Sequence, residues 1–101
     1  DDMIILRGVN LFPTQIEEIA LEQPDLSSHF VLELTRNGKM DALTVKIEPR
    51  EGVEEADAAA AAKALQQCIK TRIGTSVAVE LVPAESLERS QGKLKRLYDL
   101  R

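Results

Sequence analysis

Hydrophobic and polar residues alternate in two neighbouring stretches of the chain. The alternating hydrophobic positions are Phe30, Leu32 and Leu34 in the first stretch and Leu43, Val45 and Ile47 in the second. A period of two residues is typical of strands that bury one face. Asn37-Gly38 lies between the stretches, and both residues tolerate the positive φ that a type I′ turn requires. The pattern therefore predicts an antiparallel hairpin.

A helical period replaces this alternation over residues 53–73. Acidic residues crowd the beginning of the segment, while Lys70 and Arg72 lie near its end, an arrangement that complements the helix dipole. Gly74 is placed to end the helix. The predicted inward positions are Ala61, Leu65, Cys68, Ile69 and Ile73.

Shorter elements precede and follow these two. The apolar run of residues 3–6 favours a strand. A helix is predicted to begin either at the capping box Thr14–Glu17 or with Pro13 at its first position, and to end before Pro24. A last strand is predicted over residues 77–81.

The order strand, helix, strand, strand, helix, strand predicts an α+β fold. We expect a small split-βαβ (ferredoxin-like) sandwich with a mostly antiparallel sheet and helices packed on one face. A chain of 101 residues suits one domain. The segment from Glu85 to Arg101 does not continue this core pattern.

Composition limits the class of protein. The hydrophobic fraction is 44% and the charged fraction is 30%, values typical of globular proteins. The apolar runs are shorter than the roughly 20 residues that a membrane span needs, so we expect no membrane association. With one cysteine and no recognisable leader, the chain is expected to be cytoplasmic.

Charge is unevenly distributed along the chain. The net charge is −4, yet residues 87–101 hold five basic and two acidic side chains and the remainder is strongly acidic. A basic segment of this kind favours an anionic partner. Ser90-Gln91-Gly92 followed by Lys93 could bring a positive charge to a phosphate or carboxylate. The acidic balance and scarce aromatic residues argue against nucleic acid as the partner.

Other chemically interesting residues have structural explanations. Cys68 falls on the inward helix face and is expected to be a buried small hydrophobe. His29 has no second histidine or cysteine nearby, so we expect a surface residue and no metal site. Glu17 and Glu18 are interpreted as carboxylates near a helix start.

Two segments resemble motifs of the adenylate-forming enzymes. Residues 1–17 match the pattern D-D-x-I-x-x-R-G-x-x-x-x-P-x-x-I-E, and residues 7–13 resemble its phenylacetate–CoA ligase branch in particular. Residues 88–96, with the sequence ERSQGKLKR, resemble the closing lysine motif of the family. The resemblance covers essentially the whole chain.

The resemblance implies the C-terminal lid domain of an ATP-dependent, AMP-forming aryl-acetate (phenylacetate)–CoA ligase. Such an enzyme joins a carboxylate to ATP and then transfers the acyl group to coenzyme A, and the lid rotates between the two steps. ATP and Mg²⁺ would be bound mainly by a large N-terminal domain that is absent here. The fragment alone is expected to be inactive, and a homodimeric parent is left open.

The resemblance also assigns roles to particular residues. Lys93 matches the catalytic lysine of adenylation, with Lys95 as the alternative because the motif is one residue shorter than usual. Asp1 matches the hinge. The loop lining the path of coenzyme A corresponds to Arg7, Gly8 and Val9.

The implied organisation is a hinge strand and loop over residues 1–12, an α+β core over 13–86 and a catalytic-lysine tail over 87–101. A function of a different class is also compatible with the predicted fold. The chain would then be a stand-alone ferredoxin-like regulatory module that binds a small ligand.

Overall fold

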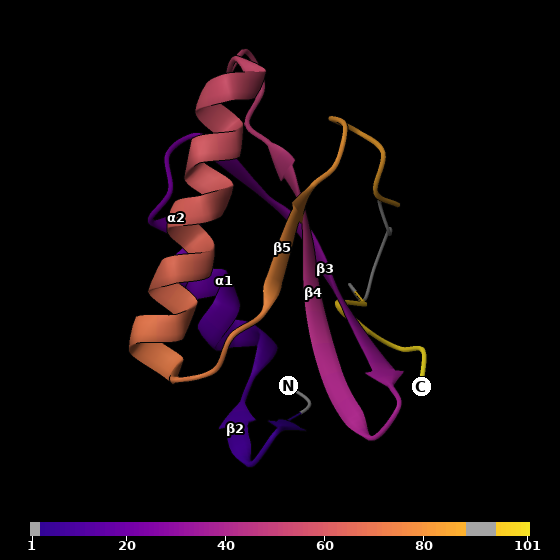
Figure 1. The fold of residues 1–101 in the computed structure, drawn as a ribbon. Coiled ribbons are helices and arrows are strands. Elements are labelled where there is room, and N and C mark those ends of the chain that lie inside the picture. Colours follow the sequence, from indigo (N-terminus) through magenta and orange to yellow (C-terminus); the bar gives the residue numbers. More distant parts are fainter. Residues whose placement is uncertain (1–2, 89–94) are drawn as a thin grey trace.

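The computed structural model describes residues 3–88 and 95–101. A four-stranded sheet has the order β5-β4-β3-β6, and Figure 1 shows both helices on the same side of it. A separate two-stranded sheet pairs β1 with β2. The elements in chain order are β1 (Ile4–Leu6), β2 (Val9–Leu11), α1 (Pro13–Leu21), β3 (Leu26–Asn37), β4 (Met40–Pro49), α2 (Glu55–Ile73), β5 (Ala78–Leu81) and β6 (Leu97–Asp99).

The predicted central hairpin is confirmed as β3 and β4, with its hydrophobic positions buried in the core. Its turn lies one residue later than predicted. Asn37 still pairs with Met40, so Gly38 and Lys39 are the central residues. Gly38 has φ +67°, and Arg7 and Glu85 are the non-glycine residues of the described chain with positive φ. A positive φ at the first central position alone is the signature of a type II′ turn, which requires glycine there.

Helix α2 confirms the long helix and its end. Gly74 adopts the left-handed conformation at φ +96°, and its N–H donates to the carbonyls of Ile69 and Lys70. On the inward face Ala61, Leu65 and Ile69 are buried. The other two predicted inward residues, Cys68 and Ile73, are half-buried and pack against the core. Cys68 is thus a packing residue, as predicted, though only partly buried.

Helix α1 begins with Pro13, the second of the two predicted starts. The side chain that caps it is Gln15, whose Oε1 accepts a hydrogen bond from the Phe12 N–H at 2.8 Å. Proline suits the first helical position because that N–H would have no partner in the helix. The capping box predicted for Thr14 and Glu17 is therefore wrong. The carboxylate of Glu17 instead pairs with a side chain from another segment of the chain.

The α+β class with helices on one face is confirmed, while the strand connections differ from the prediction. Strand β1 pairs with β2 instead of joining the main sheet, because the turn at Arg7-Gly8 reverses the chain after three residues. Helix α2 joins adjacent parallel strands, β4 and β5, with no strand between them. Strand β6, which the pattern did not predict, runs parallel to β3. The sheet is therefore mixed, with one antiparallel pair at its centre.

The core lies between the sheet and the two helices, and the N-terminal hairpin contributes to it. Ile4, Leu6 and Leu11 are buried together with residues of both helices and the sheet. This burial anchors both strands of the hairpin to the core. None of the helices in the described residues has the length and hydrophobicity needed to cross a membrane.

Candidate functional site

Arg7 and Arg96, one from each segment singled out by the sequence, bind toward opposite ends of the β3–β4 hairpin. Arg96, just before β6, lies beside β3: the Leu32 N–H donates to its carbonyl at 2.7 Å, and its side chain donates to the carbonyls of Ser28 and Phe30. The side chain of Arg7 reaches Asp41, which pairs with Arg36 near the other end of β3. Phe30, whose carbonyl accepts from Arg96, and Arg36 are six residues apart in the strand, or roughly 20 Å. One domain therefore presents two distinct places for chemistry.

The turn between β1 and β2 consists of Arg7 and Gly8. Arg7 has φ +47° and Gly8 has φ +82°, and positive φ at both central residues defines a type I′ turn. Leu6 pairs with Val9 across it, and Val9 is half-buried. A Cβ built on Gly8 would meet no atom within 4 Å. Within this domain, glycine is required by the backbone conformation and not by crowding.

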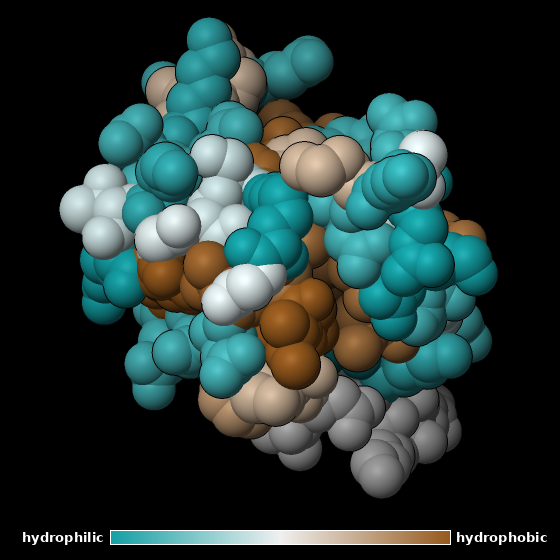
Figure 2. All heavy atoms as spheres, turned by 60° about the horizontal axis from the view of Figure 1, so that its bottom comes forward, coloured by the Kyte–Doolittle hydropathy of each residue, from teal (hydrophilic) through white to brown (hydrophobic). Residues whose placement is uncertain are grey.

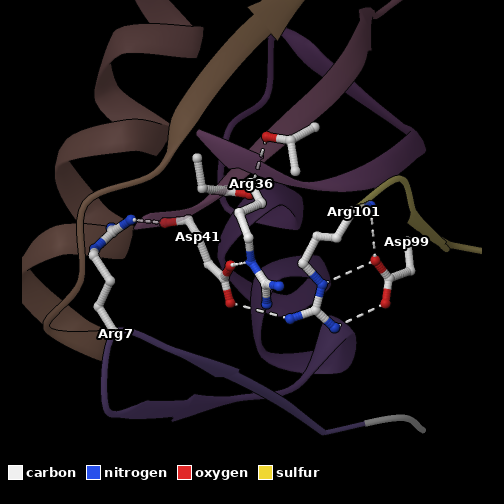
Figure 3. A network of polar contacts seen from close by, with 7 residues as sticks. Arg7, Arg36, Asp41, Asp99 and Arg101 are labelled. Carbon is white, nitrogen blue, oxygen red and sulfur yellow. Dashed lines mark hydrogen bonds and ion pairs between the residues drawn. The ribbon is translucent and has the colours of Figure 1, made fainter. Parts of the chain in front are cut away.

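The guanidinium of Arg7 faces the body of the domain. Nη1 donates to the main-chain carbonyl of Asp41 at 2.7 Å, a contact visible in Figure 3. Nη2 donates to Thr75 Oγ1 at 3.1 Å and to the carbonyl of Ser76. Thr75 is buried, with 4% of its surface exposed. Arg7 thus ties the turn both to β4 and to the connection between α2 and β5.

Asp41 is shared by several arginines (Figure 3). Its Oδ1 accepts from Arg36 Nε at 2.8 Å and its Oδ2 accepts from Arg101 Nη1 at 3.0 Å. The hydrogen bond from Arg36 is the main reason why the pKa of Asp41 is lowered. Arg101 also donates to Asp99 from Nε and Nη2, and these bonds lower the pKa of Asp99 to about 2. The network fastens the C-terminal residues to the start of β4.

Arg96 anchors the beginning of the C-terminal segment. Its Nη1 donates to the carbonyls of Ser28 and Phe30, each at 3.0 Å, and its Nη2 donates to Glu17 Oε2 at 2.7 Å. The guanidinium also lies over the Phe30 ring, 4.0 Å from its centroid. Only 17% of the Arg96 side chain is exposed. Arg96 therefore joins α1, β3 and the C-terminal segment.

A cavity of about 230 Å³ lies beside this anchor. Its described lining residues are His29, Phe30, Val31, Leu87, Glu88, Lys95, Arg96 and Tyr98. Lys95 Nζ lies over the Tyr98 ring, 4.5 Å from its centroid. His29 is exposed at the edge of β3, as the sequence predicted for a surface histidine.

Two predicted site residues cannot be placed. Lys93 and Asp1 lie outside the described residues. Among residues 3–88 and 95–101, no three histidine, cysteine, aspartate or glutamate side chains form a group able to hold a metal ion.

Glu48 is a buried carboxylate that the sequence did not single out. Its Oε1 accepts from the Glu85 N–H at 2.7 Å and its Oε2 accepts from the Leu87 N–H at 2.9 Å. Glu48 follows the buried Ile47 in β4, so alternation alone would place its side chain on the face away from the helices. The segment around residues 85–87 covers that face, and no local signal in the sequence announces such a long-range contact.

Comparison with known proteins gives a consistent set of relatives. The family described as the AMP-binding enzyme C-terminal domain matches residues 8–101. The phenylacetate-coenzyme A ligase of Aromatoleum evansii is 45% identical over 106 residues, and that of Escherichia coli strain K12 is 40% identical over 104 residues. Both alignments cover 100% of this chain, which spans 24% of the length of either relative.

Solved structures share the fold. A crystallised domain of phenylacetate-coenzyme A ligase from Bacteroides vulgatus is 35% identical with a TM-score of 0.88, covering 100% of this chain and 94% of that one. A 2-hydroxyisobutyryl-CoA ligase in its thioesterification state is 28% identical with a TM-score of 0.88, covering 98% of this chain and 21% of that one. The same ligase in its postadenylation state gives a TM-score of 0.86 at 29% identity, covering 100% and 22%.

Proposed function

The chain belongs to the family of AMP-binding enzyme C-terminal domains, and on that premise we propose that it is the mobile C-terminal domain of an AMP-forming phenylacetate–CoA ligase. The relatives that it matches over its whole length carry the name of that enzyme. The parent would first form phenylacetyl-adenylate and pyrophosphate from phenylacetate and ATP. It would then pass the acyl group to the thiol of coenzyme A.

The observation that carries this proposal is the separation of Arg7 and Arg96, one from each motif-bearing segment, along the β3–β4 hairpin. Two successive reactions at one active site can use two places on a mobile domain, if the domain rotates between them. The relative solved in a thioesterification and a postadenylation state matches this chain almost equally well in both, with TM-scores of 0.88 and 0.86. That similarity supports rotation of the domain as a rigid body about a hinge, which we assign to Asp1.

In the first reaction the C-terminal segment would supply a lysine. An ammonium group beside the carboxylate and phosphate oxygens stabilises the charge that develops during in-line transfer. We assign this role to Lys93, with Lys95 as the alternative. The ammonium of Lys95 already lies over the Tyr98 ring, which favours Lys93. ATP and its Mg²⁺ are assigned mainly to the large N-terminal domain of the parent.

In the second reaction the turn at Arg7-Gly8 would line the path of coenzyme A. The space next to Gly8 is free within this domain, so a thiol-bearing chain can pass there without displacing domain atoms. Half-buried Val9 would support the turn from the β2 side. A stand-alone regulatory module, the other function considered, gains no support from relatives that are named as ligases.

The test uses the full-length parent enzyme carrying Lys93→Ala or Lys95→Ala. Phenylacetate-dependent exchange of pyrophosphate into ATP reports adenylation, and supplied phenylacetyl-adenylate with coenzyme A reports transfer. Lys93→Ala is expected to slow exchange by orders of magnitude and to spare transfer, while Lys95→Ala keeps most of both. If neither variant slows exchange, the assignment of an adenylation lysine to this segment fails.

A further inference from the structure

Arg7 occupies a backbone conformation that is unfavourable for arginine. Type I′ turns favour asparagine or glycine at both central positions, because other residues pay about 1–2 kcal/mol in the left-handed region. Arg7 has φ +47° at the first of these positions. A turn chosen only to reverse the chain would gain stability from asparagine there. The arginine side chain must therefore contribute something that asparagine cannot.

The contribution lies in the reach of the guanidinium. Its contacts at Asp41, Thr75 and Ser76 lie 34, 68 and 69 residues away in sequence. A fork of nitrogens on a long side chain can satisfy acceptors from two segments at once, whereas the short side chain of asparagine cannot. All three acceptors are neutral oxygens of the domain itself. Both terminal nitrogens of Arg7 thus donate inward, toward the domain.

We propose that Arg7 is a positioning residue that holds the Gly8 turn in the conformation required for acyl transfer to coenzyme A. The inference rests on the proposed function, because it needs the turn to line the path of the coenzyme. The role of Arg7 expected from the sequence therefore changes. Its side chain holds the turn against the rest of the domain and does not contact the coenzyme. Without it, the turn would keep its glycine but lose its fixed orientation against β4 and the α2–β5 connection.

The experiment introduces Arg7→Gln and, separately, Thr75→Val into the full-length parent enzyme and measures both half-reactions. A displacement of about 1 Å in a positioning element can cost up to about 100-fold in rate. Arg7→Gln is expected to lower the transfer rate at saturating coenzyme A by about 10- to 100-fold and to leave pyrophosphate exchange within twofold. Thr75→Val removes one acceptor and is expected to lower the transfer rate by a smaller factor. Thr75→Ser keeps the hydroxyl acceptor and is expected to keep the original transfer rate.

Two matched controls come from the same network. Asp41→Asn keeps the main-chain carbonyl that accepts from Arg7, and Arg36→Gln removes an arginine that binds the carboxylate of Asp41 but not the turn. Both are expected to leave transfer unchanged. A loss of transfer in these controls equal to that in Arg7→Gln would overturn the proposal, because the whole network would then matter and not the hold on the turn.

A third variant separates this inference from the proposed function. Gly8→Leu adds bulk directly to the proposed path. If Gly8→Leu abolishes transfer while Arg7→Gln and Thr75→Val do not slow it, the turn lines the path and the positioning role is wrong. If Gly8→Leu also leaves transfer intact, the proposed path itself is wrong. A rise in the KM for coenzyme A with unchanged maximal rate in Arg7→Gln would indicate direct contact with the coenzyme and also overturn the proposal.

Discussion

The Arg7–Gly8 turn and the C-terminal segment over residues 95–101 are both fixed to the same sheet by arginines, but through different chemistry. Arg7 donates to two main-chain carbonyls and a buried hydroxyl, all of them neutral. Arg101 donates to the carboxylates of Asp41 and Asp99, and Arg96 donates to the carboxylate of Glu17 as well as to two main-chain carbonyls. Neutral acceptors do not titrate, and exposed ion pairs are weakened by salt and acid. The Arg7 attachment therefore involves no titratable acceptor, whereas the attachment of the C-terminal segment depends in part on carboxylates and so on pH.

The difference suits the two proposed roles. A wall along the path of coenzyme A works best when it keeps one shape. Polar contacts hold the described residues on either side of the segment that would deliver a lysine. Before it, Glu48 accepts hydrogen bonds from the backbone at residues 85–87, and after it, Arg96 forms an ion pair just before β6.

The largest effect on stability is expected from Arg96. Arg96→Met removes the ion pair with Glu17 and leaves the carbonyls of Ser28 and Phe30 without this donor. We expect a loss of about 3 kcal/mol in the free energy of unfolding, since several hydrogen bonds of a mostly buried charge are lost together. Urea denaturation of the 101-residue domain measures it. Arg36→Met, which removes an exposed arginine, is the matched control and should change much less.

A smaller effect is expected at the two turn glycines. Gly8→Ala and Gly38→Ala each force alanine into a positive φ, at +82° and +67°, and neither new Cβ meets an atom within 4 Å. Each should cost about 1 kcal/mol of stability. In the parent enzyme only Gly8→Ala should slow transfer to coenzyme A. Equal kinetic losses in the two variants would show that strain alone, and not the place of the turn, explains the effect.

Lowering the pH is expected to affect the C-terminal segment but not the Arg7–Gly8 turn. The pKa of Asp99 is lowered to about 2 by Arg101, so the bond between these two residues within the C-terminal segment contributes stability above pH 4 and loses it as the pH falls toward 2. Titration followed by NMR should show the Asp99 carboxyl carbon changing near pH 2, together with the Leu100 amide. The Gly8 amide should not change over the same range. Equal changes at both amides would contradict the proposed difference in attachment.

The smallest effect is expected at an ion pair that belongs to neither region. Arg72 Nη1 donates to Glu22 Oε1 at 2.6 Å, the two side chains are 46% and 52% exposed, and this bond lowers the pKa of Glu22. Exposed pairs of this kind contribute little to folding. Arg72→Ala should therefore leave the urea midpoint unchanged within error and provide the baseline for the Arg96 variant. A loss comparable to that of Arg96→Met would show that the pairs are not ranked by burial.

The elements with a strong period could be predicted from the sequence. The β3–β4 hairpin and helix α2 follow from alternation and from Gly74, because local patterns fix which face is buried. The turns show the limit of local signals. Asn37-Gly38 predicted a type I′ turn, but the turn lies one residue later and is of type II′. Arg7-Gly8 forms a type I′ turn although arginine seldom occupies the first central position of such a turn.

The candidate site depended on contacts that no local pattern encodes. Arg96 donates to Glu17, and the backbone of residues 85–87 donates to Glu48. Both sets of bonds join residues far apart in sequence. Strand β6 is only three residues long, too short for a period, and it forms because β3 offers an unpaired edge. The motif resemblance identified the two segments, but the neutral anchoring of Arg7 became visible only in the fold.

The central claim is that the two ends of this domain serve two different half-reactions. Its most direct test measures pyrophosphate exchange and acyl transfer side by side in the full-length parent enzyme carrying either Lys93→Ala or Gly8→Leu. The account predicts opposite losses: exchange collapses in Lys93→Ala with transfer retained, and transfer collapses in Gly8→Leu with exchange retained. Loss of the same half-reaction in both variants would contradict it.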